Sequence, residues 1–401
     1  MSALVSTAAP APAASASGRG PAKGWCPGVV DPMQTGDGWL LRVRLPGGSL
    51  SADDLRAVAA VARQLGSGFV DLTSRANVQV RGVAGHDVDR ASRLLVAAGL
   101  AQPAASVDSR RAVVASPLAG HDSEARVDAT PVVTAVVDRL VADLDGAVPS
   151  KFGVVVDDGG SWSLAGVDGD IAFEAVSTGW IVRVRGVAAP VGLAITPADV
   201  ADTALAGARL CVAGAARLDR VVGEIGIDRV VAALGLAPVP PDARRVRSGV
   251  VGRSRMLGLS RHREVGRCNL VAAPFLGRLD ADMLIEIADA AERARAAIRI
   301  TPDHSIALCS IAADAAPALV ASLVGLGLVV DTDDPRANVS ACVGSRGCAS
   351  AHADTWVVAH ALSAQPSGGR THLSACAKCC GAPPDSAGLV HLVADTSGVF
   401  R

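Results

Sequence analysis

The chain has 401 residues, with 38 Lys and Arg against 39 Asp and Glu, and a formal net charge of −1. This balance argues against a general nucleic-acid binder, and a composition with no Tyr argues against stacking platforms for single strands. The best candidate for a membrane span, residues 316–330, is shorter than the roughly 20 residues that a spanning helix needs. We therefore expect a cytoplasmic protein with neither a nucleic acid nor a membrane as partner.

The amino-terminal part carries ordinary signals. Residues 1–24 are rich in Ala, Pro and Ser, which predicts a disordered tail. Further on, Ser51 followed by Asp54 three residues later predicts the capped start of a helix. The apolar residues of this helix recur at helical spacing: Leu55, Val58, Ala59, Ala62 and Leu65.

The segment "SRANVQVRG" from Ser74 alternates apolar and polar residues, which predicts a strand with two different faces. Its apolar face carries Ala76, Val78 and Val80. Its polar face carries Arg75, Asn77, Gln79 and Arg81. We interpret this basic, amide-rich face as a binding face; a solvated strand edge is the alternative.

A second copy of this helix–strand pattern begins near Ala273, with Thr73 aligned to Thr301 and Arg110 to Arg336. The similarity is weak at each residue but keeps its order, which indicates an internal repeat. At the polar positions the second copy has Asp303, Ser305, Ala307 and Cys309. Because a single site needs its chemistry only once, we expect the first copy to supply the binding face.

Two further units follow the two copies. The first contains helix patterns at Thr130–Leu144 and Pro197–Val212 and the strand-like "KFGVVVDDGG" from Lys151. The second ends in the strand-like "GLVHLVAD". The predicted organisation is a tail at 1–24, a half-domain at 25–121, an α/β unit at 122–245, a second half-domain at 246–330 and a cysteine-bearing unit at 331–401.

Five of the nine cysteines fall between positions 342 and 380. Cys342 and Cys348 form one spaced pair, and Cys376 and Cys380 form another. Two such pairs suit a [4Fe–4S] cluster, in which each iron takes one cysteine sulfur. Zinc, which prefers closer pairs, and reduced thiols that cluster by chance are the alternatives. Cys379 is a surplus thiol.

For three of the other cysteines the sequence predicts a structural role. Cys211, Cys268 and Cys309 stand alone in apolar surroundings, so we interpret them as small core residues.

The chain resembles the nitrite/sulfite reductase family, which has two pseudo-symmetric halves and a C-x5-C…C-x3-C motif. The resemblance rests on "WCPGVVDPM", "DLTSRANVQVRG", "VVASPLAG", "KFGVVVDDGG", "ACVGSRGC" and "HLSACAKCC". It implies an α+β fold in which each half is a ferredoxin-like half-domain followed by an α/β domain. "SPLAG" and "CPG" are most similar to the members that act in cobalamin biosynthesis.

The resemblance to those members implies an O2-dependent monooxygenase that hydroxylates precorrin-3A with formation of a γ-lactone. It implies a [4Fe–4S] cluster on Cys342, Cys348, Cys376 and Cys380, and electrons from an external reductase or ferredoxin. It also implies a mononuclear non-haem iron. Candidate ligands are His304, His352 and His372, for which a structural role is the alternative.

The resemblance places Arg111 and Lys151 beside Arg75 in a central cleft, where these three residues are the candidate catalytic groups. Arginine binds carboxylates in bidentate fashion, so the candidate substrate-binding residues share an affinity for the acidic side chains of a tetrapyrrole. They are Arg75, Asn77, Gln79, Arg81, Arg111 and Lys151.

The chain departs from the family pattern at a few positions. Gly153 replaces a second basic residue, which weakens the case for sulfite or nitrite as substrate. Ala112, Ala375 and Cys379 also differ from the common residues. The alternative functions are a sirohaem-dependent sulfite or nitrite reductase and an iron–sulfur electron carrier.

Overall fold

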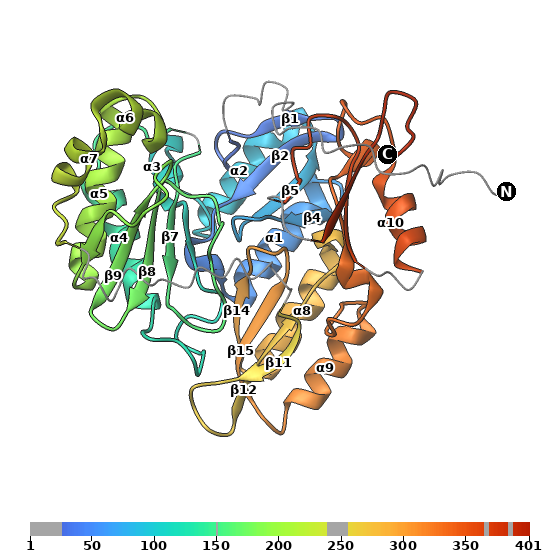
Figure 1. The fold of residues 1–401 in the computed structure, drawn as a ribbon. Coiled ribbons are helices and arrows are strands. Elements are labelled where there is room, and N and C mark those ends of the chain that lie inside the picture. Colours follow the sequence, from blue (N-terminus) through green and yellow to red (C-terminus); the bar gives the residue numbers. More distant parts are fainter. Residues whose placement is uncertain (1–25, 150, 239–255, 365–368, 384–387) are drawn as a thin grey trace.

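The computed structural model describes residues 26–149, 151–238, 256–364, 369–383 and 388–401. The predicted tail at 1–24 and the predicted boundary at 245/246 lie outside the described residues. Within them the chain forms two linked half-domain sheets, a mixed α/β unit and a small carboxyl-terminal unit (Figure 1). This arrangement confirms the α+β class with two ferredoxin-like half-domains.

The half-domains are built from short strands and amphipathic helices. The first contributes β1 (Met33–Thr35), β2 (Gly38–Val43), β3 (Ser49–Leu50), α1 (Ala52–Leu65), β4 (Phe69–Leu72), β5 (Val78–Val83) and α2 (Val88–Ala97). The second contributes β11 (Gly258–Arg261), β12 (Arg267–Ala272), β13 (Arg278–Asp280), α8 (Ala281–Arg293), β14 (Ala297–Ile300), β15 (Ile306–Ala312) and α9 (Ala316–Gly325).

The two half-domains exchange strands. One sheet has the order β1-β2-β5-β4-β13 and the other β11-β12-β15-β14-β3, so each copy lends a short strand to the sheet of the other. Their helices α1 and α8 pack on a shared apolar core. Neither sheet is therefore complete without the other copy. We infer that the two copies fold as one body.

The sequence signals of α1 are confirmed. The Ser51 hydroxyl accepts from the Asp54 amide at 3.1 Å, and the Asp54 carboxylate accepts from the Ser51 amide at 2.7 Å. The predicted apolar stripe along the helix is buried.

The internal repeat is confirmed at the level of single hydrogen bonds. The Thr73 amide donates to the Asn77 carbonyl at 3.0 Å, and the Thr301 amide donates to the Ser305 carbonyl at 2.9 Å. Each threonine hydroxyl in turn accepts from the amide of its partner, at 3.1 and 3.0 Å. The same turn therefore leads into β5 and into β15.

A mixed sheet of order β10-β9-β8-β7-β6 forms the middle unit, which has its own apolar core. Strands β6, β7 and β8 run parallel, and β9 and β10 are antiparallel. Its elements are α3 (Ala105–Asp108), β6 (Val113–Ala115), α4 (Thr130–Asp143), β7 (Val154–Asp157), β8 (Ile171–Val176), β9 (Gly179–Val184), β10 (Gly192–Ala194), α5 (Pro197–Ala213), α6 (Leu218–Ile225) and α7 (Ile227–Leu234). Helices α4 and α5 lie where the sequence predicted them.

The carboxyl-terminal unit is small. It contains β16 (Val339–Ala341), α10 (Thr355–Ser363), β17 (Arg370–Ser374) and β18 (Leu389–Val393). The three strands form a parallel sheet of order β16-β17-β18. Strand β18 coincides with the strand predicted from "GLVHLVAD". Among the described residues, no helix has both the length and the apolar character for a membrane crossing.

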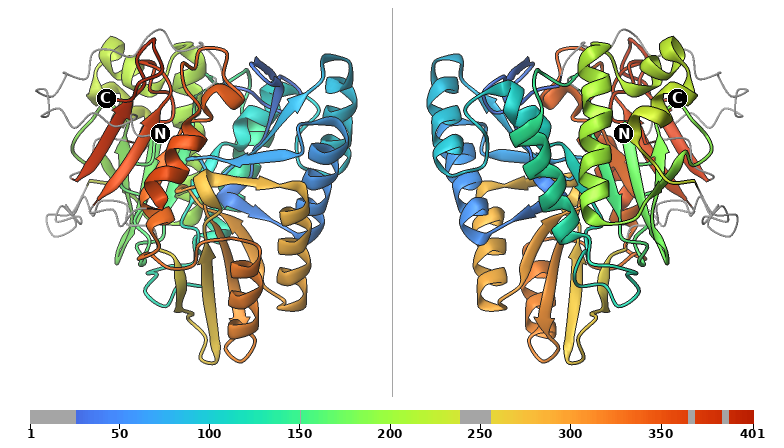
Figure 2. Two further views of the ribbon diagram at one scale, coloured as in Figure 1. Left: turned by 90° about the vertical axis from the view of Figure 1, so that its right-hand side faces the viewer. Right: turned by 90° about the vertical axis from the view of Figure 1, so that its left-hand side faces the viewer.

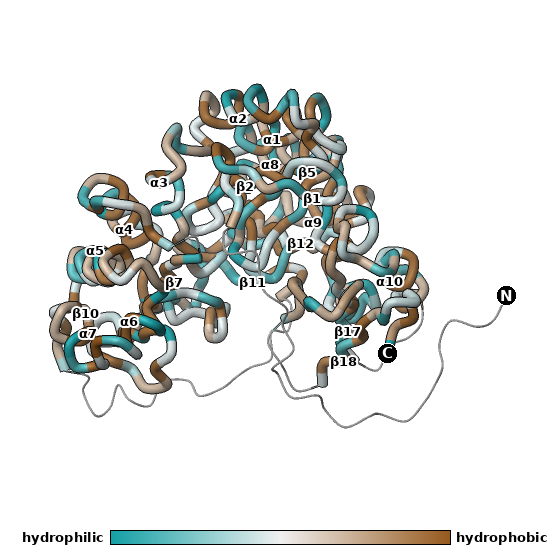
Figure 3. Tube along the Cα trace, turned by 90° about the horizontal axis from the view of Figure 1, so that it is seen from above, coloured by the Kyte–Doolittle hydropathy of each residue, from teal (hydrophilic) through white to brown (hydrophobic). Residues whose placement is uncertain are grey.

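The four parts form an arch. The middle unit lies to one side and the carboxyl-terminal unit to the other, with the exchanged half-domains joining them (Figures 1 and 3). Side views show both half-domains stacked along one side of the molecule (Figure 2). The sheets of the two outer units therefore face a common space.

Candidate functional site

A cavity of about 1140 Å³ lies between the middle unit and the carboxyl-terminal unit. One wall comes from β7, β8, β9 and the loop that ends at Asp170, and the other from β16, β17 and the cysteine loop. Its basic lining residues are Arg75, Lys151, Arg183, Arg185, Arg217 and Arg370, and its acidic ones are Asp157, Asp168, Glu174 and Asp303. The wall is therefore rich in charge, with more cations than anions.

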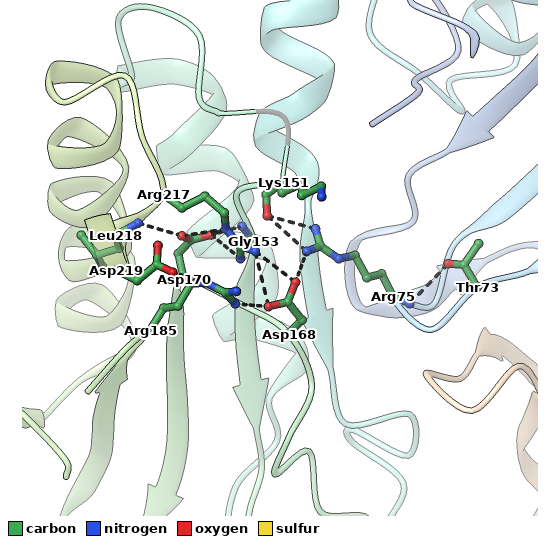
Figure 4. A network of polar contacts seen from close by, with 10 residues as sticks. All are labelled: Thr73, Arg75, Lys151, Gly153, Asp168, Asp170, Arg185, Arg217, Leu218 and Asp219. Atoms are coloured by element: carbon green, nitrogen blue, oxygen red, sulfur yellow. Dashed lines mark hydrogen bonds and ion pairs between the residues drawn. The ribbon is translucent and has the colours of Figure 1, made fainter. Parts of the chain in front are cut away.

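Three of these arginines converge on one carboxylate, Asp168 (Figure 4). Arg75 donates to it at 2.6 Å and Arg217 at 3.1 Å, and Arg185 is bonded to it as well. Asp168 keeps a pKa of about 2: burial opposes its ionisation, but the three guanidinium groups favour it more strongly. We call Asp168 with Arg75, Arg185 and Arg217 the carboxylate hub.

The carboxylate hub is supported by a second carboxylate, Asp170, which is fully buried. Asp170 accepts from Arg217 at 2.9 Å, from the Gly153 amide at 3.1 Å and from the Leu218 amide at the start of α6 at 3.0 Å. The position of Arg217 is thus set from below by Asp170. Sequence reasoning missed this whole arrangement, although "DGD" at 168–170 and "RVR" at 183–185 place charges at alternate positions.

Arg75 joins the first half-domain to the hub. Besides Asp168, its guanidinium donates twice to the main-chain oxygen of Lys151, at 3.2 Å each. Lys151 contributes only that oxygen to the network, so its ammonium has no partner among the described residues (Figure 4). The structure therefore brings two of the predicted site residues, Arg75 and Lys151, together at the cavity.

The predicted binding strand is shorter than expected. Strand β5 begins at Val78, and Ala76, with a φ of 54°, closes a turn before it. Arg75 and Asn77 are therefore turn residues rather than strand residues. The Asn77 side-chain oxygen accepts from the Leu45 amide at 3.0 Å, which is a structural contact. Periodicity alone could not reveal this turn, because the turn also alternates in polarity.

Gln79 and Arg81 do not line the cavity described above. Gln79 accepts from Arg42 at 2.7 Å, and Arg81 is buried against Asp37 and Asp71. Arg81 also donates to the Gly347 carbonyl at 2.9 Å. Arg81 therefore ties the first half-domain to the loop that carries Cys348.

Arg111 likewise contacts residues away from the cavity. Its guanidinium donates to the Leu100 carbonyl at 3.1 Å and pairs with the buried carboxylate of Asp108 at 3.3 Å. Arg111 does not line the cavity described above. A buried acidic partner inside its own unit holds this arginine, and the sequence pattern did not show that partner.

The four predicted cluster ligands lie close enough to influence one another, and Cys380 is the one of the four that lines the cavity. Burial raises the pKa of the Cys342 thiol, and nearby Cys376 and Cys348 raise it further. The amides of Ala375, at 3.2 Å, and Gly344 donate to the Cys342 sulfur and oppose this shift. Such donors stabilise a thiolate, which is the form that binds iron. The donor set therefore fits an iron–sulfur cluster.

Cys380 connects this thiol group to the cavity. Burial raises its pKa, as do the neighbouring Cys376 and Cys348, and Cys380 itself lines the cavity. A group bound by the four thiols would therefore lie against whatever fills the cavity.

The isolated cysteines lie away from this thiol group. Cys211 and Cys309 are buried in apolar cores, and burial raises the pKa of each thiol to about 12.

Comparisons with known proteins agree with this architecture. The profile described as "Nitrite/Sulfite reductase ferredoxin-like half domain" matches residues 31–98 and 261–326, which are the two exchanged half-domains. The chain is 31% identical to a precorrin-3B synthase from Sinorhizobium sp. over 91% of this chain and 79% of that protein. The chain belongs to the nitrite/sulfite reductase family, a family of oxidoreductases.

Other members of the nitrite/sulfite reductase family are similar over most of the chain. A ferredoxin sulfite reductase from Mycolicibacterium paratuberculosis is 27% identical over 81% of this chain and 62% of its own length. A ferredoxin–nitrite reductase from Synechococcus elongatus is 27% identical over 86% of this chain and 74% of its own. The Mycobacterium tuberculosis NirA structure superposes with a TM-score of 0.70 at 24% identity, over 86% of this chain and 69% of that one.

The candidate ligands of a mononuclear iron are not assembled in this family member. His304 and His372 both line the cavity, and burial lowers the pKa of His372 to about 4. Across the described ranges, however, no three His, Cys, Asp or Glu side chains are arranged to hold a single metal ion. These residues do not fit a mononuclear site, so no step of the reaction is assigned to one.

Cys379 occupies a position that favours glycine. Its φ is 47°, in the left-handed region, where a β-carbon is strained. We expect Cys379→Gly to leave the iron and sulfide content unchanged and to raise stability by about 1 kcal/mol. Iron analysis and thermal unfolding of the reconstituted variant check this. A fall in iron content would show that Cys379 is a ligand.

Proposed function

We propose that this chain catalyses the precorrin-3B synthase reaction, the O2-dependent hydroxylation of precorrin-3A with γ-lactone formation in aerobic cobalamin biosynthesis. One oxygen atom enters the substrate and the other leaves as water, with two electrons and two protons supplied from outside. The choice of substrate rests on the similarity to the Sinorhizobium enzyme. The structural observation that carries the proposal is that Cys380 belongs to the four-thiol group and also lines a cavity of about 1140 Å³.

In this proposal, electrons reach the cavity through a cluster held by the four cysteine thiols. A [4Fe–4S] cluster on Cys342, Cys348, Cys376 and Cys380 supplies single electrons when bound, which O2 requires. The chain holds the ligands by the amides that donate to Cys342 and by the anchor of Arg81 on the Gly347 carbonyl. The electron donor is external, a ferredoxin or a reductase.

The opposite side of the cavity binds the substrate. Precorrin-3A carries acetate and propionate carboxylates, and the cation of Lys151 is the proposed binding group on the middle-unit side. Arg75 holds Lys151 at the cavity through two hydrogen bonds to its main-chain oxygen. Gly153 has no side chain with which to grip a small oxyanion. Its amide instead donates to Asp170. The site is accordingly suited to a large polycarboxylate rather than to sulfite.

A sirohaem-dependent sulfite or nitrite reductase is the second candidate. It is favoured by the reductases that are similar over most of this chain. Under it the same cavity holds sirohaem as a resident cofactor and the cluster beside it reduces a small anion. The two candidates differ in what the cavity contains after purification.

Anaerobic purification followed by turnover under ¹⁸O2 tests the proposal. We expect an iron–sulfur spectrum with no Soret band, and precorrin-3A converted to a product that carries one ¹⁸O atom. A Soret band with sulfite or nitrite reduction would establish the reductase instead. A cluster without binding of any tetrapyrrole would indicate an electron carrier, and zinc in place of iron a structural scaffold.

A further inference from the structure

The cations of the cavity differ in how far they are neutralised. Arg75, Arg185 and Arg217 share Asp168 in the hub (Figure 4). Arg185 pairs in addition with Asp219, and Arg217 with Asp170. The carboxylates of the protein therefore already occupy much of the anion-binding capacity of the middle-unit wall.

Two cavity cations escape this neutralisation. Arg183 has Glu174 at 3.8 Å, but Lys151 and Arg370 have no ion-pair or hydrogen-bond partner in the part of the chain that the structure describes. Both side chains are half-buried. Since no carboxylate of the described chain neutralises either charge, these two positions are able to accept a carboxylate from a ligand.

The two cations stand on different walls. Lys151 precedes β7 of the middle unit, and Arg370 opens β17 of the carboxyl-terminal unit, across the arch (Figures 1 and 3). The same strand leads directly to the loop of Cys376 and Cys380. At a rise of about 3.3 Å per residue, β17 separates Arg370 from the cysteine end by roughly 13 Å. Arg370 is therefore placed for the edge of a ligand that lies away from the thiols.

We infer that Arg370 binds a carboxylate of the tetrapyrrole substrate and acts with Lys151 as a two-point clamp across the cavity. This inference rests on the proposed function and adds a specificity residue from the carboxyl-terminal wall. A macrocycle with carboxylates around its rim meets both cations at once, and one with few carboxylates does not. The guanidinium fork fixes the orientation of the bound group, which an ammonium does less well.

Binding of porphyrin probes to the reconstituted full-length protein tests the clamp. The probes are uroporphyrin, with eight carboxylates, and coproporphyrin, with four. We expect Arg370→Gln to raise the Kd for uroporphyrin about tenfold, the loss typical of a charge-assisted hydrogen bond, and to reduce its salt dependence. Arg370→Lys should lie between the parent and Arg370→Gln. The preference for uroporphyrin over coproporphyrin should shrink in both variants.

The control is Arg93→Gln, which removes one exposed positive charge on α2 outside the cavity and should leave both Kd values unchanged. The cluster spectrum of each variant reports folding of the carboxyl-terminal unit, and Arg370→Lys serves as the test if Arg370→Gln loses the cluster. Parent-like binding by the Arg370 variants, with weakened binding in Lys151→Gln, would overturn the clamp and leave the proposed function standing. A parent protein that binds no tetrapyrrole would overturn both.

Discussion

Arg81→Ala should lower the free energy of unfolding by about 3 kcal/mol, because it removes a buried guanidinium and leaves the half-buried Asp37 without its cation, while Asp71 keeps Arg278 as a partner. The Arg81 side chain is 5% exposed and donates to Asp37 at 2.9 and 3.0 Å. It is also bonded to the Gly347 carbonyl, which receives the Gly36 amide as well, at 3.2 Å. Loss of this anchor should loosen the loop of Cys348, so iron retention should fall with stability.

Denaturant unfolding and the iron and sulfide content after reconstitution measure these two effects. The control is Arg63→Ala on α1, whose ion pair with Asp282 is half-exposed and is worth less than about 1 kcal/mol. If Arg81 were a substrate-binding residue, as its strand pattern suggested, its removal would weaken tetrapyrrole binding and spare the cluster. Parent-like unfolding with full iron content would therefore contradict the structural role.

Local signals in the sequence predicted local structure well. The capping pair Ser51 and Asp54 and the apolar stripe behind them located α1, because helix starts and amphipathic faces depend on residues a few positions apart. The repeat around Thr73 and Thr301 was visible because both turns need the same side-chain acceptor. The cysteine spacing likewise pointed to one place in the fold.

The partners of the polar residues could not be predicted in this way. Alternation placed Gln79 and Arg81 on a polar face, but their partners lie on β2, in the β1–β2 turn and in the cysteine loop, far away in sequence. The exchange of strands between the two copies could not be predicted either, because β3 and β13 are too short to show the alternation that identifies a strand in the sequence. Asp168 was missed because an aspartate in a loop has no distinguishing local pattern, and the three arginines that bind it come from different parts of the chain.

The hub and the cysteine loop are held by different buried charges, so their functions should separate on mutation. Asp170→Asn should remove about 3 kcal/mol of stability, because the new amide donor faces the donors of Arg217 and the charge that balances them is gone. Arg217 would then lose its hydrogen bond to a buried carboxylate. Asp168 and Arg75, which depend on Arg217 for their positions, would be held less firmly. We expect weaker tetrapyrrole binding with an unchanged iron content, since Asp170 and the four thiols lie in different units.

Asp219→Asn is the matched control, because Asp219 lies at the edge of the hub, is 38% exposed and contacts only Arg185 among the hub arginines. Its stability loss should stay below about 1 kcal/mol. Hydrogen exchange along α6 should rise in Asp170→Asn alone, since the Leu218 amide loses its acceptor. Loss of iron in Asp170→Asn, or loss of iron together with weakened porphyrin binding in Arg81→Ala, would show that one network supports both sites. With two networks, each variant weakens one property and spares the other, so the cavity can bind its ligand whether or not the four thiols hold a cluster.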